Sequence, residues 1–117
     1  MIRDVIDLRI YQLALKLLKP LSELAKKIPD RELRFQLMDA GKGVAPQIHE
    51  GFSKKKSVRE FKRYLSIAMG SSDEAVTHLR EAEILYCDCF GPDEIKQLIE
   101  EYKSLSKQIN RTIQSWS

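Results

Sequence analysis

Apolar residues recur every three or four positions through almost the whole chain, and this spacing restricts the fold more than any other feature. Residues on one face of an α-helix repeat with that period, whereas residues on one face of a β-strand alternate. The sequence has no alternating β-branched runs and no Asn-Gly or Asp-Gly turns. Prolines and glycines divide the periodic pattern into four predicted helices, at residues 8–28, 31–50, 57–90 and 92–115.

The ends of these segments carry capping signals. Asp30 is placed to cap the second helix, and Ser57 has the S-x-x-E spacing of a capping box at the start of the third. Gly51 suits a left-handed C-cap after the second helix, and Pro92 suits the first turn of the fourth. Because the connections are short, neighbouring helices are expected to run antiparallel. The prediction is an all-α, antiparallel, up-down four-helix bundle.

The length and composition of the chain favour one globular domain. A chain of 117 residues buries about two-thirds of the surface that its unfolded form exposes, so we expect a single domain at residues 1–117. Two cysteines, Cys87 and Cys89, are too few for a disulfide framework and are expected to be reduced thiols. No apolar run approaches the ~18 residues that span a bilayer, and Asp4 and Asp7 interrupt any signal-peptide core. We therefore expect a cytoplasmic protein without a membrane partner.

The first predicted helix carries two apolar rows, which lie roughly 110° apart at about 100° per residue. A helix in a monomeric bundle buries one stripe, so a second row favours contact with another subunit. Pro20 is expected to kink this helix. Small residues in the middle of the third helix favour close approach of another helix, within or between subunits. We predict a homo-oligomer whose interface includes Leu8, Tyr11, Leu15, Leu18, Gly70 and Ser71.

Six basic side chains crowd residues 54–63, where only Glu60 opposes them. Lysines that follow a helix C-terminus suit its dipole, but Arg59 lies in the first turn of the next helix, where positive charge is disfavoured. The arginine and its neighbours are expected to face outward and could bind phosphates, whereas Phe61 and Tyr64 are expected on the core side. A solvated turn and a nucleic-acid-binding surface both remain open. The candidate nucleic-acid-binding residues are Lys54, Lys55, Lys56, Arg59, Lys62 and Arg63.

Catalytic and metal-binding patterns are missing from the sequence. In an antiparallel hairpin, His49 and His78 lie roughly 27 Å apart within a subunit, so they do not share a metal ion. Neither histidine has a glutamate three residues earlier, as the di-metal four-helix bundles require. We therefore expect no enzyme activity, no metal, no cofactor and no small-molecule substrate.

Several stretches resemble a known bacterial family. FQLMDAGKGVAPQIHEG and EFKRYLSIAMGSSDEAVTHL are similar to the four-helix-bundle proteins encoded in intervening sequences of 23S ribosomal RNA genes. The opening DLRIYQLALKLL resembles the first helix of that family, and IPDREL its entry to the second. The accessory variability proteins of diversity-generating retroelements belong to the same superfamily. The recurrent positions fall at Glu50-Gly51, Phe61, Ala68, Gly70-Ser71, Glu74 and Thr77-His78-Leu79.

The resemblance implies a homopentameric barrel of four-helix protomers without enzyme activity. For the retroelement branch it implies binding to a reverse transcriptase and to RNA or DNA. The chain departs from the family where QIHEG replaces Asn-Ile-Ala-Glu-Gly, and where Val76 replaces an acidic residue. The basic pair usual in the second helix is replaced by residues 39–43, of which only Lys42 is basic. Residues 54–63 are thus the main basic feature.

Two functions follow as hypotheses. The first is a non-enzymatic, homo-oligomeric nucleic-acid-binding bundle, which in a retroelement would act as a reverse-transcriptase accessory. The alternative is a protein-interaction scaffold encoded in a ribosomal RNA intervening sequence, without nucleic-acid binding. In that case the charges serve solubility, and the partner face is acidic and comprises Glu94, Glu100 and Glu101.

Overall fold

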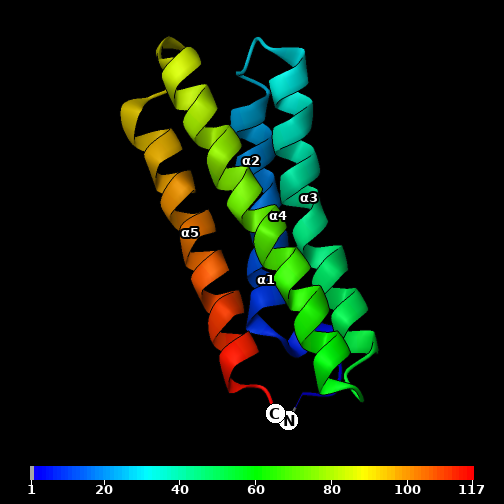
Figure 1. Cartoon of the computed structure of the whole chain (residues 1–117). Helices are drawn as coiled ribbons and strands as arrows, with labels where there is room; N and C mark the ends of the chain where they lie inside the picture. Colours follow the sequence, from blue (N-terminus) through cyan, green and yellow to red (C-terminus); the bar gives the residue numbers. More distant parts are fainter. Residues whose placement is uncertain (1) are drawn as a thin grey trace.

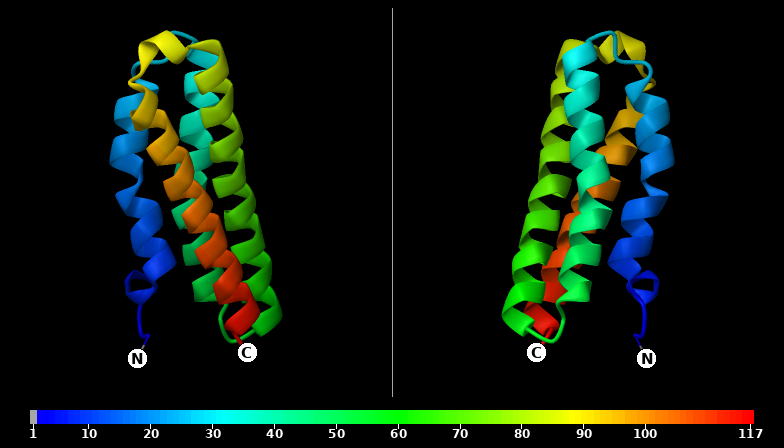
Figure 2. Two further views of the ribbon diagram at one scale, coloured as in Figure 1. Left: turned by 90° about the vertical axis from the view of Figure 1, so that its left-hand side faces the viewer. Right: turned by 90° about the vertical axis from the view of Figure 1, so that its right-hand side faces the viewer.

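The computed structural model describes residues 2–117, and every regular element within that range is helical (Figure 1). The two consecutive helices α1 and α2 lie end to end, so the chain forms a bundle of four antiparallel helical segments (Figure 2). The bundle is elongated, with extents of 47 × 23 × 20 Å. Among residues 2–117, each helix is too short or too polar to cross a lipid bilayer. The elements in chain order are η1 (Val5–Asp7, a 3₁₀ turn), α1 (Arg9–Lys16), α2 (Leu18–Ala25), α3 (Arg31–Ser53), α4 (Val58–Leu85), η2 (Cys87–Cys89, a 3₁₀ turn) and α5 (Pro92–Ser115).

The first segment differs from the continuous helix predicted at residues 8–28. It breaks at Leu17 between α1 and α2, and α2 ends at Ala25. Pro20, in the first turn of α2, has no N–H to donate to the carbonyl of Lys16 four residues earlier, so the two helices are not joined by a complete hydrogen-bond ladder. The predicted kink is therefore a break in the helix, placed three residues before the proline.

The second segment begins as predicted but ends later. The Asp30 carboxylate accepts a hydrogen bond from the Leu33 N–H at 3.1 Å, which confirms the N-cap. The prediction of a left-handed Gly51 is wrong, because no described residue has a positive φ and α3 continues to Ser53. Gly51 is buried, and a Cβ added there would lie 2.9 Å from the Cβ of Tyr64. Its role is therefore to let α3 and α4 approach closely.

The predicted third helix, at residues 57–90, ends earlier than expected. At its start, the Ser57 hydroxyl accepts from the Glu60 N–H at 3.2 Å, but the Glu60 carboxylate binds Arg63, so the predicted capping box is half formed. At its end, α4 stops at Leu85 and the chain turns through η2. The Tyr86 hydroxyl donates to the Asp30 carboxylate at 3.1 Å, joining this end of α4 to the start of α3.

The core between the helices is mostly aliphatic, with one buried polar chain between α4 and α5. The Ser106 hydroxyl donates to the Ser72 hydroxyl at 2.8 Å, and Ser72 in turn donates to the backbone carbonyl of Tyr102 at 3.0 Å. Both serines are buried. These bonds fix the register of α4 against α5, because a shift along either helix would leave the hydroxyls unpaired.

Candidate nucleic-acid interface

The six basic residues lie at one end of the bundle, at the turn between α3 and α4. The N- and C-termini lie at the same end (Figure 1). Lys54 is the C-cap of α3, the next three residues form the exposed turn, and α4 begins at Val58. Five of the six basic residues are exposed, and Lys62 is half-buried. The structure thus brings the predicted cluster together on one accessible end.

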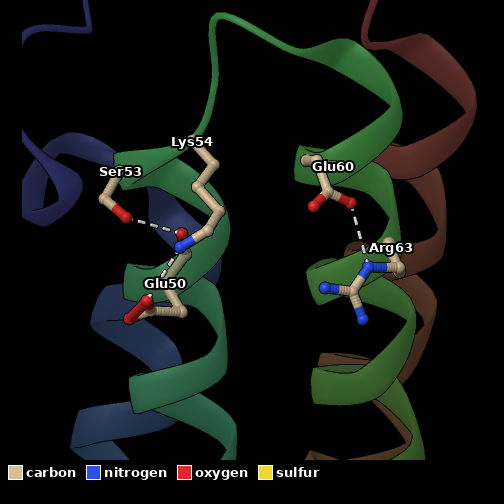
Figure 3. Close-up of polar contacts among 5 residues, drawn as sticks. All are labelled: Glu50, Ser53, Lys54, Glu60 and Arg63. Carbon is tan, nitrogen blue, oxygen red and sulfur yellow. Dashed lines mark hydrogen bonds and ion pairs between the residues drawn. The ribbon is translucent and has the colours of Figure 1, made fainter.

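Two of these cations are held by carboxylates of the same chain (Figure 3). The Lys54 ammonium lies 3.1 Å from the Glu50 carboxylate, and the Arg63 guanidinium lies 3.0 Å from that of Glu60. Hydrogen bonding to Arg63 lowers the pKa of Glu60, and the bond to Glu50 raises the pKa of Lys54. All four side chains are well exposed, so these pairs contribute little to stability. The prediction that Glu60 alone opposes the cluster is therefore incomplete.

Glu50 is the residue that the sequence interpretation missed. Its spacing from Lys54 is i, i+4, and side chains at that spacing lie on the same face of a helix. The interpretation ended the helix at residue 50 and placed a left-handed glycine after it, so the two residues were not expected on one helix. Once α3 is extended to Ser53, the pair follows from spacing.

The aromatic rings near the cluster are already in contact with protein groups. Phe61 is fully buried and its ring centroid lies 4.4 Å from that of Trp116. Tyr64 is half-buried, and its ring lies 4.5 Å from the Arg63 guanidinium carbon. The Lys55 ammonium lies 3.9 Å from the centroid of the Phe52 ring. The Tyr64 and Phe52 rings therefore contact basic side chains, as in cation–π pairs, and Phe61 is buried against Trp116, so these rings do not offer open faces to bases.

Four cations of the cluster have no carboxylate within 4 Å among residues 2–117, and one of them, Lys55, lies against the Phe52 ring. The other three are Lys56 in the turn, Arg59 in the first turn of α4, and Lys62 one turn further on. Arg59 stands at a helix N-terminus, where the dipole disfavours positive charge. A negative ligand at this end would relieve that repulsion.

Five of the six predicted oligomer-interface residues divide into three groups. Leu8 is only 5% exposed and belongs to the core of its own chain, so it does not lie on the outer surface that the predicted interface requires. Leu15 is 41% exposed and lines a hollow of about 450 Å³ between α1 and α3, together with Tyr11 and Leu18. Gly70 is exposed, and a Cβ added there meets nothing within 4 Å. Whether these surfaces contact another subunit stays a prediction.

Ser71, the remaining predicted interface residue, packs within the chain. It is half-buried, and a Cβ added to Gly43 of α3 would lie 3.2 Å from its hydroxyl oxygen. The close helix approach inferred from the small residues of α4 is therefore found at the α3–α4 contact, and Gly70 beside it faces outward.

The histidines and cysteines do not converge. His49 lines the α1–α3 hollow, whereas His78 lies on α4 with its ring nitrogen 2.6 Å from the Glu81 carboxylate. Cys87 and Cys89 are free and exposed in η2. Within residues 2–117, no three His, Cys, Asp or Glu side chains are grouped as a metal site requires.

Comparison with known proteins adds one finding to this geometry. A family model described as 23S rRNA-intervening sequence protein matches residues 6–111, which is most of the chain and includes all five α-helices except the end of α5. No curated protein shows a significant match.

Proposed function

Because the chain belongs to the 23S rRNA-intervening sequence protein family, we propose that it is a non-enzymatic protein that binds RNA or DNA through its basic end. The observation that carries this proposal is a set of three cations there, Lys56, Arg59 and Lys62, which contact neither a carboxylate nor an aromatic ring among residues 2–117. They lie on an exposed turn and the first helical turns after it. Basic side chains without internal partners are free to replace the counterions of a phosphate backbone. The proposed contacts are to phosphates, so they carry no base specificity.

Lys54, Lys55 and Arg63 belong to the same proposed surface but act differently. Lys54 and Arg63 would have to exchange the carboxylates of Glu50 and Glu60 for phosphates, which reduces the gain from each contact. Lys55 keeps its charge while it lies against the Phe52 ring. The unpaired cations therefore dominate the expected salt dependence, with a slope of log affinity against log salt of roughly −3 for three phosphates.

The test is fluorescence-anisotropy binding to a structured RNA and to duplex DNA over a salt series. In the variant Lys56→Glu/Arg59→Glu/Lys62→Glu, binding at low salt should fall steeply and the slope should flatten. The matched control, Lys19→Glu/Arg80→Glu/Lys96→Glu, changes the net charge by the same amount, from +3 to −3, at exposed sites outside the cluster. Equal losses in both variants would mean that net charge alone causes the effect. Weak, salt-insensitive binding by the native chain would refute the proposal.

We also propose that the protein acts as a homo-oligomer, and a pentamer is the assembly to test. Supporting this is the apolar row of Tyr11, Leu15 and Leu18, which borders a hollow beside α3. Leu15 is exposed and the other two side chains are half-buried. An exposed leucine beside an apolar hollow is typical of a subunit contact. A pentamer of the 13.6 kDa chain has a mass of about 68 kDa.

Light scattering coupled to size exclusion measures that mass directly. Leu15→Glu places a charge on the exposed row and should reduce the mass to that of one chain, without loss of helical circular dichroism. Glu83→Lys, a charge change at a half-buried position of α4 outside this row, serves as the control. A native protein that runs at 13.6 kDa would refute the oligomer.

A reverse-transcriptase accessory role is the more specific form of the proposal. It uses the same basic end, because an accessory of that kind also has to hold nucleic acid. Co-purification with a reverse transcriptase encoded beside the gene, with and without nuclease treatment, tests it. Absence of such a neighbouring gene, or of any complex with its product, would refute the accessory role without affecting the proposal of nucleic-acid binding.

A further inference from the structure

Two connected hollows lie along the seam between the first and last helical segments. One, of about 290 Å³, lies between α1 and α5, and the other, of about 510 Å³, lies between α2 and α5. They share Lys16 and Glu101, so they form one elongated cleft, which we name the α1–α5 cleft. The left view of Figure 2 shows α5 diverging from α1 toward the ends of the chain. The summed volume is within the range of small-molecule sites.

The break in the first helix accounts for the position of the larger hollow. Leu17, the residue at the break, and Pro20 both line it. Because a proline cannot donate to the carbonyl four residues earlier, the helix loses one rung at Lys16 and the two halves need not follow a single straight axis. The break therefore places Leu17 and Pro20 at the larger hollow, and the packing of α5 beside this segment forms the cleft.

The polar groups of the cleft are segregated along its length. The smaller hollow has the cations Arg9 and Lys16, with further side-chain donors from Gln12, Ser104 and Gln108. The Gln12 amide also donates to the Ile6 carbonyl and the Gln108 amide to the Ser104 hydroxyl, which leaves one N–H of each amide for a ligand. It is therefore rich in donors, and Glu101, which it shares with the larger hollow, is the only carboxylate among its described lining residues. This chemistry suits an anion with several acceptor oxygens, such as a phosphate.

The larger hollow has the opposite character. Glu23, Glu94 and Glu101 line it, and within the part of the chain that the structure describes, Lys16 is the only cation that lines it. The Lys27 ammonium lies 2.6 Å from the Glu94 carboxylate and neutralises it, whereas the Glu101 carboxylate accepts a bond from the Gln97 amide at 3.2 Å and keeps acceptor capacity. The hollow would repel a phosphate and attract N–H donors.

The larger hollow also has an apolar floor. Leu17, Leu24 and Leu98 line it, and each is at most 4% exposed, so these side chains are fixed by the core. A flat, largely apolar group with polar edges can lie on such a floor while its edge reaches the carboxylates. Nucleobases have that shape, and a carboxylate accepts hydrogen bonds from their exocyclic amines.

We propose that the α1–α5 cleft binds one nucleotide, with its phosphate between Arg9 and Lys16 and an amine-bearing base on the apolar floor beside Glu101. The nucleotide is either a free mononucleotide or one unit of a bound strand, and only the second source rests on the proposed nucleic-acid function. The basic end holds phosphates without reading bases, whereas the cleft favours cytosine, adenine or guanine over uracil and thymine. It lies on a different face of the protein from the α1–α3 hollow.

The experiment is an NMR titration of the ¹⁵N-labelled protein with cytidine monophosphate, uridine monophosphate and ribose 5-phosphate. Cytidine monophosphate should shift the side-chain amide signals of Gln97 and Gln108 in a saturable manner. Its affinity should exceed that of uridine monophosphate by about fivefold or more, the size of one base-edge contact. Ribose 5-phosphate should shift Gln108 alone.

Variants separate the two ends of the site. Arg9→Ala should weaken both nucleotides by about tenfold, the loss of one charged hydrogen bond. Glu101→Gln retains an acceptor for Gln97 but loses the charge, and should remove the preference for cytidine. Lys19→Ala, an exposed cation of α2 outside the cleft, should change neither affinity. Equal binding of both nucleotides with no effect of Glu101→Gln would overturn the base position.

Two further measurements identify the source of the nucleotide and test whether this site is independent of the basic end. Displacement of a labelled oligocytidylate by cytidine monophosphate would assign the cleft to a unit of a strand, whereas binding of the mononucleotide without displacement would assign it to a free ligand. The Lys56→Glu/Arg59→Glu/Lys62→Glu variant should still bind cytidine monophosphate, even if it no longer binds long nucleic acid. The absence of saturable shifts at Gln97 and Gln108 with either the mononucleotide or the oligonucleotide would overturn the inference, whatever the basic end binds.

Discussion

The Tyr102 hydroxyl is buried without a hydrogen-bond partner, and its removal is expected to stabilise the protein. The side chain is 0% exposed, and its oxygen has no partner among the described residues. A Cβ added to Gly41 of α3 would lie only 3.1 Å from this oxygen, so the hydroxyl is packed tightly against the α3 backbone. A buried unpaired hydroxyl costs about 1–3 kcal/mol. Because phenylalanine keeps the ring and its contacts, Tyr102→Phe should raise the free energy of unfolding by about that amount at pH 7.

The effect should grow at alkaline pH. Burial, with a smaller contribution from Glu101, raises the pKa of Tyr102 well above its ordinary value of 10.0. Below pH 10 the hydroxyl is protonated in both the folded and the unfolded chain, so its titration does not affect stability. Above pH 10 it ionises only in the unfolded chain, and the native protein loses about 1.4 kcal/mol of stability per pH unit up to the folded pKa. Tyr102→Phe lacks this loss, so the gap between the two proteins should widen at that rate.

Urea unfolding followed by circular dichroism, at one protein concentration and at pH 7, 9, 10.5 and 11.5, measures both effects. Tyr86→Phe is the matched control, because it removes a hydroxyl that does have a partner, the Asp30 carboxylate, and should lower stability at pH 7. A loss of more than about 1 kcal/mol in Tyr102→Phe would mean that the hydroxyl donates a hydrogen bond in the core. A gap that stays constant above pH 10 would refute the argument from burial.

Two glycines and one capping carboxylate give further predictions. Gly41→Ala should destabilise the protein by about 1–3 kcal/mol, because the new methyl would meet the Leu21 side chain, whereas Gly70→Ala, where nothing lies within 4 Å, should stabilise it by up to about 1 kcal/mol. Thermal unfolding of both variants checks this, and equal effects at the two sites would contradict it. Hydrogen bonds from the backbone N–H three residues on and from the Tyr86 hydroxyl hold the pKa of Asp30 below its ordinary 3.8. This stabilisation is present above pH 4 and is lost as the pH falls, so the difference in unfolding free energy between the native protein and Asp30→Asn should shrink between pH 5 and pH 2. A difference independent of pH would exclude a stabilising carboxylate charge.

The sequence by itself determined the number of helical segments in the bundle and the features that depend on local chemistry. The three- and four-residue spacing of apolar side chains has one physical cause, the helical period, so it predicts a four-helix bundle without knowledge of contacts. Asp30 and Pro92 mark helix starts because capping and the missing proline N–H act within a single turn. The clustering of basic residues at one end also follows locally, since they span a single turn between neighbouring helices.

Only the tertiary structure decided the features that depend on which surfaces meet. Gly51 stays helical because α3 and α4 approach each other there, and the local sequence does not reveal that contact. The helix end at Leu85 is likewise hidden, since Tyr86 continues the apolar period while its hydroxyl reaches Asp30, 56 residues away in sequence. The α1–α5 cleft lies between the first and last helices, so its charges converge only when the bundle closes. Periodicity fixes which face of a helix is buried, but packing alone sets how closely two helices approach and what lies between them.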